Sequence, residues 1–149
     1  MVLIPKNFWI RRTDCCTRLG LKPGGGGSSP FDIVQIKLNE TTDSSPPNKT
    51  VFLAQVLEDG TYYVEVKAGA LTTGGQAEII KEISAFKRVS GVLEKVNGED
   101  VLYFNDQSPG MPFVTVQVIN VGDNLFVELF GTPLTPITWG INVTIEKLN

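Results

Sequence analysis

Residues 131–149 read GTPLTPITWGINVTIEKLN, and the second half of this stretch decides the fold. Along an extended strand every second side chain points to the same side. One face of this segment is therefore apolar, with Trp139, Ile141, Val143 and Ile145, and the other is polar, with Gly140, Asn142, Thr144 and Glu146. Such alternation predicts a β-strand with one face buried and the other in water.

The same pattern recurs through the chain from residue 31 onwards. Short apolar alternations such as DIVQIKL, TVFLAQVL, TYYVEVKAGAL, FVTVQVIN and LFVELF are separated by turn residues, and no long helical period competes with them. This layout is typical of antiparallel sandwiches and barrels. The sequence therefore predicts an all-β fold, an antiparallel and jelly-roll-like β-sandwich of about eight or nine strands.

Turn residues predict how several of these strands are joined. Asp59-Gly60 is a pair favoured in tight hairpin turns, so we expect residues 50–57 and 61–71 to form a hairpin. Residues 76–89 also fit a helical pattern, but a strand is preferred. The turns at Ser90-Gly91 and Asn97-Gly98 then predict a meander of residues 83–89, 92–96 and 100–105.

A glycine-rich stretch divides the chain into unlike parts. KPGGGGSSP occupies residues 22–30, and four successive glycines make a flexible tether. The predicted organisation is a docking arm at residues 1–23, a linker at 24–30 and a sandwich domain at 31–149. Within the arm, residues 7–20 fit either a short helix, with Asn7 as its cap and Gly20 as its end, or an extended segment.

The arm carries the residues most suited to contact a partner. Residues 1–31 hold five lysines and arginines against Asp14 alone, in a chain of net charge −3. Large apolar side chains are unfavourable in water, so an arm that docks on another protein is preferred over a solvated tail. Nucleic acid is an improbable partner because the rest of the chain is acidic. The predicted partner-contact residues are Phe8, Trp9, Ile10, Arg11 and Arg12.

The chemistry needed for catalysis is sparse. The chain has no histidine, which removes the commonest general base and most metal sites. The only cysteines, Cys15 and Cys16, are adjacent and cannot staple distant segments. Two acid pairs, Glu58-Asp59 and Glu99-Asp100, are predicted to lie in turns as solvated charges. We therefore expect no enzyme, no metal and no cofactor.

The sequence also bears on where the chain is expected to act. No apolar run is long enough to cross a bilayer, so no membrane partner is expected. The start, MVLIPKNFWIRR, lacks the pattern of a secretory signal. Assembly in a reducing host cytoplasm is the simplest expectation for the two free thiols.

Four segments, in this order and spacing, resemble a tailed-phage virion module. They are QIKLNETTDSSPPNKTVF, LEDGTYYVEVKAGALTTGG, AFKRVSGVLEKV and GDNLFVELFGTPLTPITWGINVTIEKL, and the resemblance spans about residues 35–148. Similar modules occur in tail-fibre proteins and in capsid decoration or cement proteins. The resemblance implies a β-sandwich, commonly trimeric, that binds other virion proteins and catalyses nothing.

The chain departs from similar modules at two places. Pro133 and Pro136 stand where small polar residues are usual, and residues 76–82 are shorter and more aliphatic. Because the chain begins at its own methionine and ends with the module, we expect a stand-alone capsid decoration or cement protein, a homotrimer that binds the major capsid protein on the virion surface and stabilises the head. A tail or tail-fibre adaptor is the first alternative. A receptor- or glycan-binding module is another, because exposed aromatic side chains such as Tyr63 stack on sugars.

Overall fold

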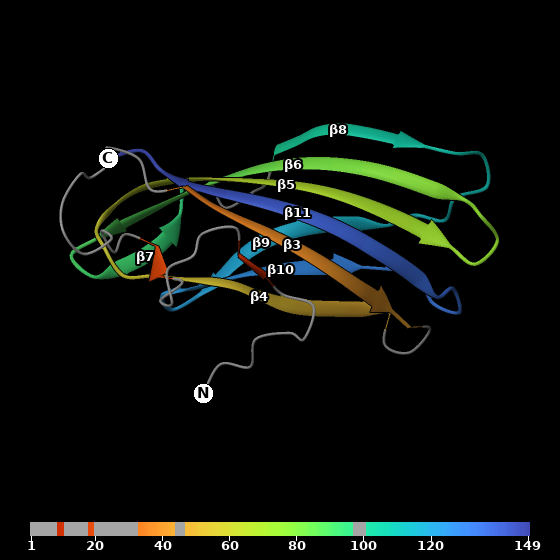
Figure 1. The fold of residues 1–149 in the computed structure, drawn as a ribbon, viewed down its shortest axis with the longest axis horizontal. Coiled ribbons are helices and arrows are strands. Elements are labelled where there is room, and N and C mark those ends of the chain that lie inside the picture. The colour runs from red at the N-terminus through yellow and green to blue at the C-terminus, as the bar shows by residue number, and fades with distance from the viewer. Residues whose placement is uncertain (1–8, 11–17, 20–32, 44–46, 97–100) are drawn as a thin grey trace.

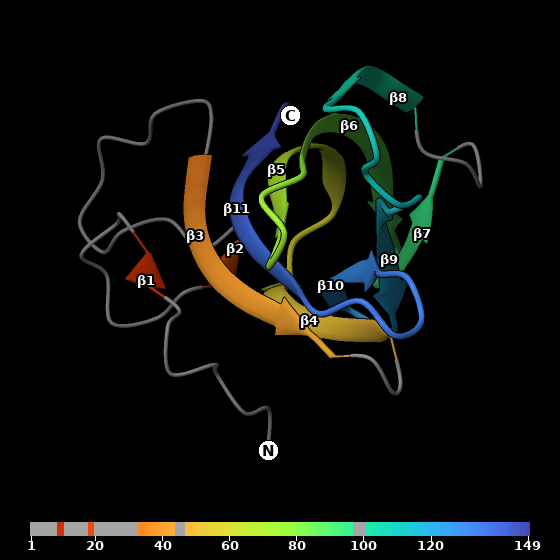
Figure 2. The same cartoon turned by 90° about the vertical axis from the view of Figure 1, so that its right-hand side faces the viewer.

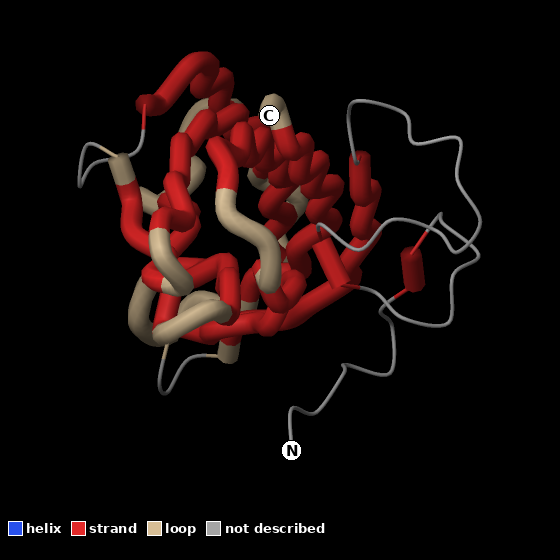
Figure 3. Tube along the Cα trace, turned by 90° about the vertical axis from the view of Figure 1, so that its left-hand side faces the viewer, coloured by secondary structure: helices blue, strands red, loops and turns tan. Residues whose placement is uncertain are grey.

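The fold consists of β-strands. The computed structural model describes residues 9–10, 18–19, 33–43, 47–96 and 101–149, and these contain strands and loops but no helix (Figure 3). It follows that the described residues hold no helix long and apolar enough to cross a membrane. The strands are β1 (Trp9–Ile10), β2 (Arg18–Leu19), β3 (Ile33–Thr42), β4 (Asn48–Val56), β5 (Gly60–Thr72), β6 (Ala77–Val89), β7 (Val92–Lys95), β8 (Val101–Gln107), β9 (Thr115–Val121), β10 (Asn124–Phe130) and β11 (Ile137–Lys147). The all-β prediction is confirmed.

Two sheets face each other across one core. The larger has the order β1-β3-β11-β5-β6, with β7 and β8 both paired to β6, and the smaller has the order β2-β4-β10-β9. Figure 1 shows the two layers from the side, and Figure 2 shows β3, β11, β5 and β6 curving over β4, β10 and β9. The pairing is antiparallel throughout, apart from β2 on β4. This arrangement is the predicted β-sandwich.

The predicted alternation decides which side chains fill the core. Trp139, Ile141, Val143 and Ile145 of β11 are at most 1% exposed, whereas Gly140 and Asn142 between them lie outside. The apolar faces of β3, β5, β9 and β10 are buried in the same way. Burial of one face of each strand therefore fixes the register of the sandwich.

The expected hairpin across Asp59-Gly60 does not form. β4 pairs with β10 and β2, while β5 pairs with β11 and β6, so the segment between β4 and β5 carries the chain from the small sheet to the large one. Gly60 has φ 153, outside the conformation of a tight primed turn. A Cβ there would lie 2.3 Å from the backbone oxygen of Asn149, which explains the glycine.

The expected meander is also wrong in its last step. Residues 77–89 form one 13-residue strand, β6, so the strand is confirmed over the helical alternative. β7 pairs with β6 at residues 86–89 and β8 pairs with β6 at residues 78–83, so β8 does not follow β7 across the sheet. The edge of β6 is long enough for both short strands, end to end.

Parts of the N-terminal arm pair with the open edges of the two sheets. Trp9 and Ile10 pair with Lys37 and Ile36 of β3, and Arg18 and Leu19 pair with β4. These two short pieces are extended. The rest of the predicted arm, including Phe8, Arg11, Arg12, Cys15 and Cys16, and the linker at 24–30 lie outside the described residues, so the division into arm, linker and sandwich stays a prediction.

Candidate functional site

Three lysines stand in one row across the outer face of the large sheet. In the strand register Lys37 of β3 lies opposite Asn142 of β11, Asn142 lies opposite Lys67 of β5, and Lys67 lies opposite Lys81 of β6. All four positions belong to the set of residues that points away from the core. We call Lys37, Asn142, Lys67 and Lys81 the lysine row.

One carboxylate lies beside this row. Glu65 is 3.3 Å from Lys67 Nζ and 3.3 Å from Lys81 Nζ, and the Tyr63 hydroxyl donates to it at 3.0 Å. Partial burial works against ionisation, but the hydrogen bonds from Tyr63, Lys81 and Lys67 outweigh it and lower the pKa of Glu65. Glu65 is therefore ionised at neutral pH. Among the described residues no ion pair involves Lys37, so positive charge exceeds negative charge here.

A pair of glycines lies next to the row. Gly69 of β5 and Gly140 of β11 face each other directly, one step along the strands from the lysines. A Cβ at Gly140 would meet nothing within 4 Å, and one at Gly69 would meet only the Gly140 oxygen at 3.9 Å. Neither glycine has the positive φ that favours this residue. Internal packing does not require them, although glycine in a strand interior is destabilising by about 0.5–1 kcal/mol relative to alanine.

The same region is hollowed. A pocket of about 420 Å³ lies over β3, β11 and β5, and all of its lining residues except Ile36 and Val143 are polar. The lining residues are Gln35, Ile36, Lys37, Glu65, Lys67, Asn142, Val143 and Thr144. Two exposed apolar side chains flank the glycine pair: Leu71, two residues after Gly69 on β5, and Ile79, opposite Gly69 on β6. The outer face of the large sheet therefore combines cations, amide and hydroxyl groups, bare backbone and a small apolar flank.

The lysine row was not among the residues predicted to contact a partner. Each member is visible in the sequence only as a polar position in an alternating strand. Lys67 and Lys81 are joined by the hairpin of the successive strands β5 and β6, and Lys37 joins them only because β11, which is far away in the sequence, pairs with both β3 and β5. Of the predicted contact residues, the structure places the backbone of Trp9 and Ile10 beside Lys37 and Ile36, at one end of the row.

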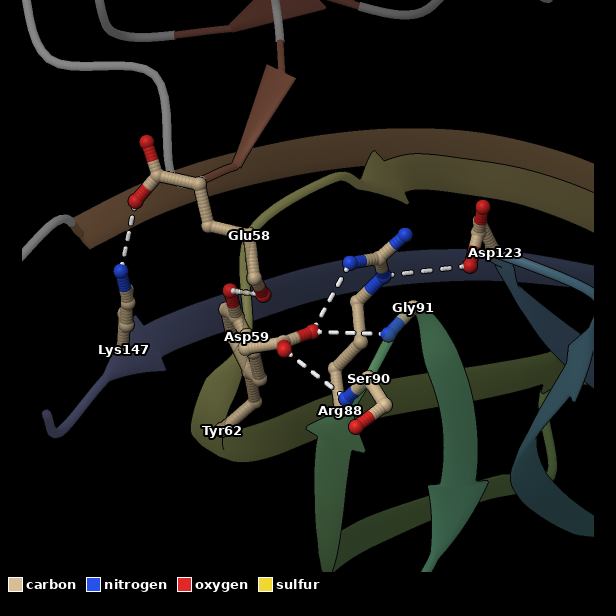
Figure 4. Close-up of polar contacts among 8 residues, drawn as sticks. All are labelled: Glu58, Asp59, Tyr62, Arg88, Ser90, Gly91, Asp123 and Lys147. Atoms are coloured by element: carbon tan, nitrogen blue, oxygen red, sulfur yellow. Dashed lines mark hydrogen bonds and ion pairs between the residues drawn. The ribbon is translucent and has the colours of Figure 1, made fainter.

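A second polar cluster lies at one end of the sandwich (Figure 4). Asp59, after β4, accepts hydrogen bonds from the backbone N–H groups of Ser90 (2.8 Å) and Gly91 (3.1 Å) and from Arg88 Nη1 (3.0 Å). Ser90 and Gly91 have φ 52 and 81, so both donors point out of a tight hairpin turn. The hydrogen bond from Gly91 lowers the pKa of Asp59; slight desolvation opposes it, and Ser90 and Arg88 add to it.

Arg88 extends this cluster to the small sheet. Its Nε donates to Asp123 Oδ1 at 3.2 Å, and the carbonyl of Asp123 accepts from the Val56 N–H at 2.8 Å. We call Asp59, Arg88, Ser90, Gly91 and Asp123 the turn clasp (Figure 4). Its charged groups are all paired with each other, and it joins the ends of both sheets. We interpret it as a structural device that fixes the two layers together.

Of the two predicted acid pairs, the structure describes Glu58-Asp59, and both of its carboxylates form contacts within the chain. Glu58 forms an ion pair with Lys147 at 2.6 Å, and its carbonyl accepts from the Tyr62 hydroxyl at 2.6 Å (Figure 4). Asp59 belongs to the turn clasp. Glu99 and Asp100 lie outside the described residues. Within the described part of the chain no group of three or more potential ligands could hold a metal ion.

Comparison with known proteins adds little. No protein-family model matches the chain, and no curated protein matches it. Among solved structures, the tailspike protein of Acinetobacter baumannii phage AM24 is similar at 15% sequence identity and a TM-score of 0.43. The match covers 77% of this chain and 25% of the tailspike, so the chain spans about a quarter of the tailspike's length.

Proposed function

We propose that the chain is a non-catalytic structural module of a tailed-phage particle, placed in the tail or a tail fibre, where it binds a neighbouring virion protein. The observation that carries this proposal is the position of the four segments that resemble phage virion modules. They coincide with the strand pairs and connections of the sandwich: β3–β4, β4–β5, β6–β7 and β10–β11. The resemblance therefore lies in the parts that build the fold.

The surface supports a single docking contact better than a broad cementing one. Specific protein interfaces bury roughly 800 Å² on each partner, and a protein that clamps several coat subunits needs more than one. Among the described residues the exposed large apolar side chains form only small groups on different strands and loops: Ile33, Leu71, Ile79, Val89, Val92, Val96, Phe113, Val121, Leu134 and Leu148. The lysine row is the one coherent feature, and it suits one partner.

Capsid decoration is the second candidate. The predicted docking arm would supply the additional contact that a cement protein needs, because a tethered second contact raises the effective concentration of the first. Phe8, Trp9, Ile10, Arg11 and Arg12 are the residues of that contact. In either place the module is proposed to act as a homo-oligomer, with the trimer preferred. The tailspike is itself a phage protein, but a TM-score of 0.43 does not separate head from tail.

Location and copy number within the particle test this proposal. The chain, labelled in purified particles and imaged by electron microscopy, is expected at the tail in few copies. Hundreds of copies on the head would contradict the tail location and support capsid decoration instead. Absence from the particle would overturn both. Deletion of residues 1–23 is the test for the arm: a folded oligomer that no longer attaches supports the arm as anchor, and undiminished attachment removes it.

A further inference from the structure

The lysine row is unusual because its cations outnumber the nearby anions. Three other described lysines each have one carboxylate partner: Lys49 has Glu40, Lys87 has Glu94 and Lys147 has Glu58. In the row, Lys67 and Lys81 lie directly opposite each other and share Glu65. Like charges directly opposite are destabilising in a sheet. An excess of cations on a chain of net charge −3 calls for a ligand as its explanation.

The chemistry of the row selects carboxylates. Neighbouring strands are about 5 Å apart, so Lys37 and Lys67 start about 10 Å apart with Asn142 between them. Lysine ammonium groups sit on flexible side chains and lack the rigid pair of parallel N–H donors that arginine presents to one anion. Together with the side-chain amide of Asn142, they therefore suit several separate carboxylates along a ligand better than one anion bound through two oxygens. Two other described outer-face carboxylates, Glu146 of β11 and Asp106 of β8, lie opposite Tyr63 and Ile79, and neither forms an ion pair with Lys37 or Lys67.

The surroundings favour a polypeptide over a saccharide or a small anion. Glycine inside a strand marks a place where another backbone approaches closely, and the space over Gly69 and Gly140 is open. Leu71 and Ile79 beside them are 50% and 56% exposed and offer apolar contact. The described lining of the pocket includes no aromatic ring on which a sugar could stack.

We propose that the lysine row docks an acidic, extended segment of a neighbouring protein. The carboxylates of that segment pair with Lys37 and Lys67, and its backbone lies over Gly69 and Gly140. That the partner is a virion protein rests on the proposed function. The binding chemistry depends only on the outer face of the large sheet.

A synthetic peptide with glutamates at alternate positions is the probe. Its binding to the full chain is followed by fluorescence anisotropy at low and at high salt, beside a peptide in which every glutamate is replaced by glutamine. We expect binding of the acidic peptide alone, weakened by salt because exposed charges are screened. Equal binding of both peptides, or binding of neither, would overturn the inference.

Variants locate the site. K37Q together with K67Q is expected to weaken binding of the acidic peptide by about fivefold to tenfold, the sum of two exposed ion pairs. K87Q is the matched control, because Lys87 is exposed on the same sheet but paired with Glu94, and it should bind as the parent does. Gly140→Ala should weaken binding several-fold without lowering Tm, a combination that a merely structural glycine would not give.

Two further measurements keep the alternatives apart. An oligogalacturonate and inorganic phosphate are tested as competitors; displacement of the peptide by either at equal carboxylate or phosphate concentration would reassign the row to that anion and overturn the polypeptide. The location experiment is independent of all of these. A chain that is absent from particles yet binds the acidic peptide through Lys37 and Lys67 contradicts the proposed function alone, whereas a tail protein that ignores the peptide contradicts the docking inference alone.

Discussion

The two ends of the sandwich differ in how completely their polar groups are hydrogen-bonded. At the clasped end, Asp59 has three donors and Arg88 joins the two sheets. At the other end, which we call the loop end, lie the loops 73–76, 108–114 and 131–136 (Figure 1). There Glu78 is 2% exposed, and one of its carboxylate oxygens has no hydrogen-bond partner in the described structure. The polar groups of the clasped end hold the two sheets together, whereas the loop end contains a buried carboxylate oxygen without a hydrogen bond.

Next to these loops, the residues around Trp139, Thr42 and Gly131 are closely packed, and we call them the corner. Trp139 is fully buried and its Nε1 donates to Thr42 Oγ1 at 2.9 Å. The N–H of Gly131 donates to the Pro47 carbonyl at 2.9 Å beside the same threonine. The corner therefore holds the strand ends together at the loop end. We expect substitutions in the corner to lower the free energy of unfolding most.

Trp139→Ala should have the largest effect on stability. The change removes the largest fully buried side chain and leaves Thr42 without its donor, so we expect the free energy of unfolding to fall by about 3–5 kcal/mol. Urea denaturation at neutral pH measures this. Ile141→Val, on the same buried face but nearer the middle of β11, should lose only about 1 kcal/mol. A loss for Trp139→Ala no larger than that would mean that the corner is not closely packed.

Gly131→Ala should be the next most damaging. A Cβ at this position would lie 2.6 Å from the Pro47 oxygen and 2.8 Å from Thr42 Oγ1, and overpacking of this kind is destabilising by about 1–3 kcal/mol. Gly140→Ala is the matched control, because its Cβ meets nothing within 4 Å, and it should raise stability by about 0.5–1 kcal/mol. Opposite signs for two glycines of neighbouring sequence would separate the packed corner from the open sheet face.

Asp59→Asn tests the clasped end. The lowered pKa of Asp59 means that its carboxylate stabilises the fold above the ordinary value of 3.8, and that this contribution disappears as the pH falls through the folded value below it. We expect the variant to melt roughly 2–4 °C lower at pH 7 and the difference to close on acidification towards pH ~3. Thermal melts across that range measure it. A difference that is independent of pH would attribute the effect to shape and not to charge.

The clasp also shows what the sequence could not predict. Alternation predicted the strands and their buried faces, and turn residues predicted the hairpin at Ser90-Gly91, because each depends on residues close together in the chain. Asp59-Gly60 was assigned a hairpin on its dipeptide. Instead, Asp59 bonds to a turn about thirty residues later, and Gly60 accommodates the chain end at Asn149. Local turn chemistry does not distinguish a hairpin from a crossing between sheets.

The lysine row could not be predicted from the sequence for the same reason. Lys67 and Lys81 meet across the hairpin of β5 and β6, but Lys37 joins them only through pairing between distant segments, with β11 inserted between β3 and β5. A sequence shows which residues face outward, but not the order of the strands. By contrast, Phe8, Trp9 and Ile10 stand out because they are adjacent in the chain, and their role as a docking contact stays a prediction.

Glu78→Gln should change stability in the opposite direction to Asp59→Asn. Burial raises the pKa of Glu78 above 4.5, and the hydrogen bond from Asn105 offsets this only in part. Glu78 therefore favours the fold most at low pH, where it is protonated, and this is lost as the pH rises through 4.5 and the folded value. The neutral amide should raise the free energy of unfolding at pH 7 by about 1 kcal/mol and by little at pH ~4. Urea denaturation at both pH values checks this; a loss at pH 7 would mean that the charge of Glu78 has a stabilising partner.

Leu134→Gly should have the smallest effect, a gain of about 0.5 kcal/mol, because glycine adopts positive φ without the steric penalty of leucine but loses more entropy on folding. Leu134 has φ 62 in the turn Thr132–Thr135, closed by the Thr135 N–H to the Thr132 carbonyl at 3.2 Å, and it follows Pro133. This is the position where such a turn normally has glycine. Thermal melts of Leu134→Gly and Leu134→Asn, two residues that tolerate this conformation, measure the strain.

A gain in both variants would mean that the isolated chain keeps a strained leucine for no benefit to its own fold. Its side chain is 87% exposed, and nearby Phe113, whose carbonyl accepts from Thr132 Oγ1 at 2.5 Å, is 80% exposed. Strain of this kind concentrates at contact and functional sites. A loss of stability in both variants would instead show that Leu134 packs on its own chain, and the loop end would then resemble the clasped end, with its side chains committed to the fold.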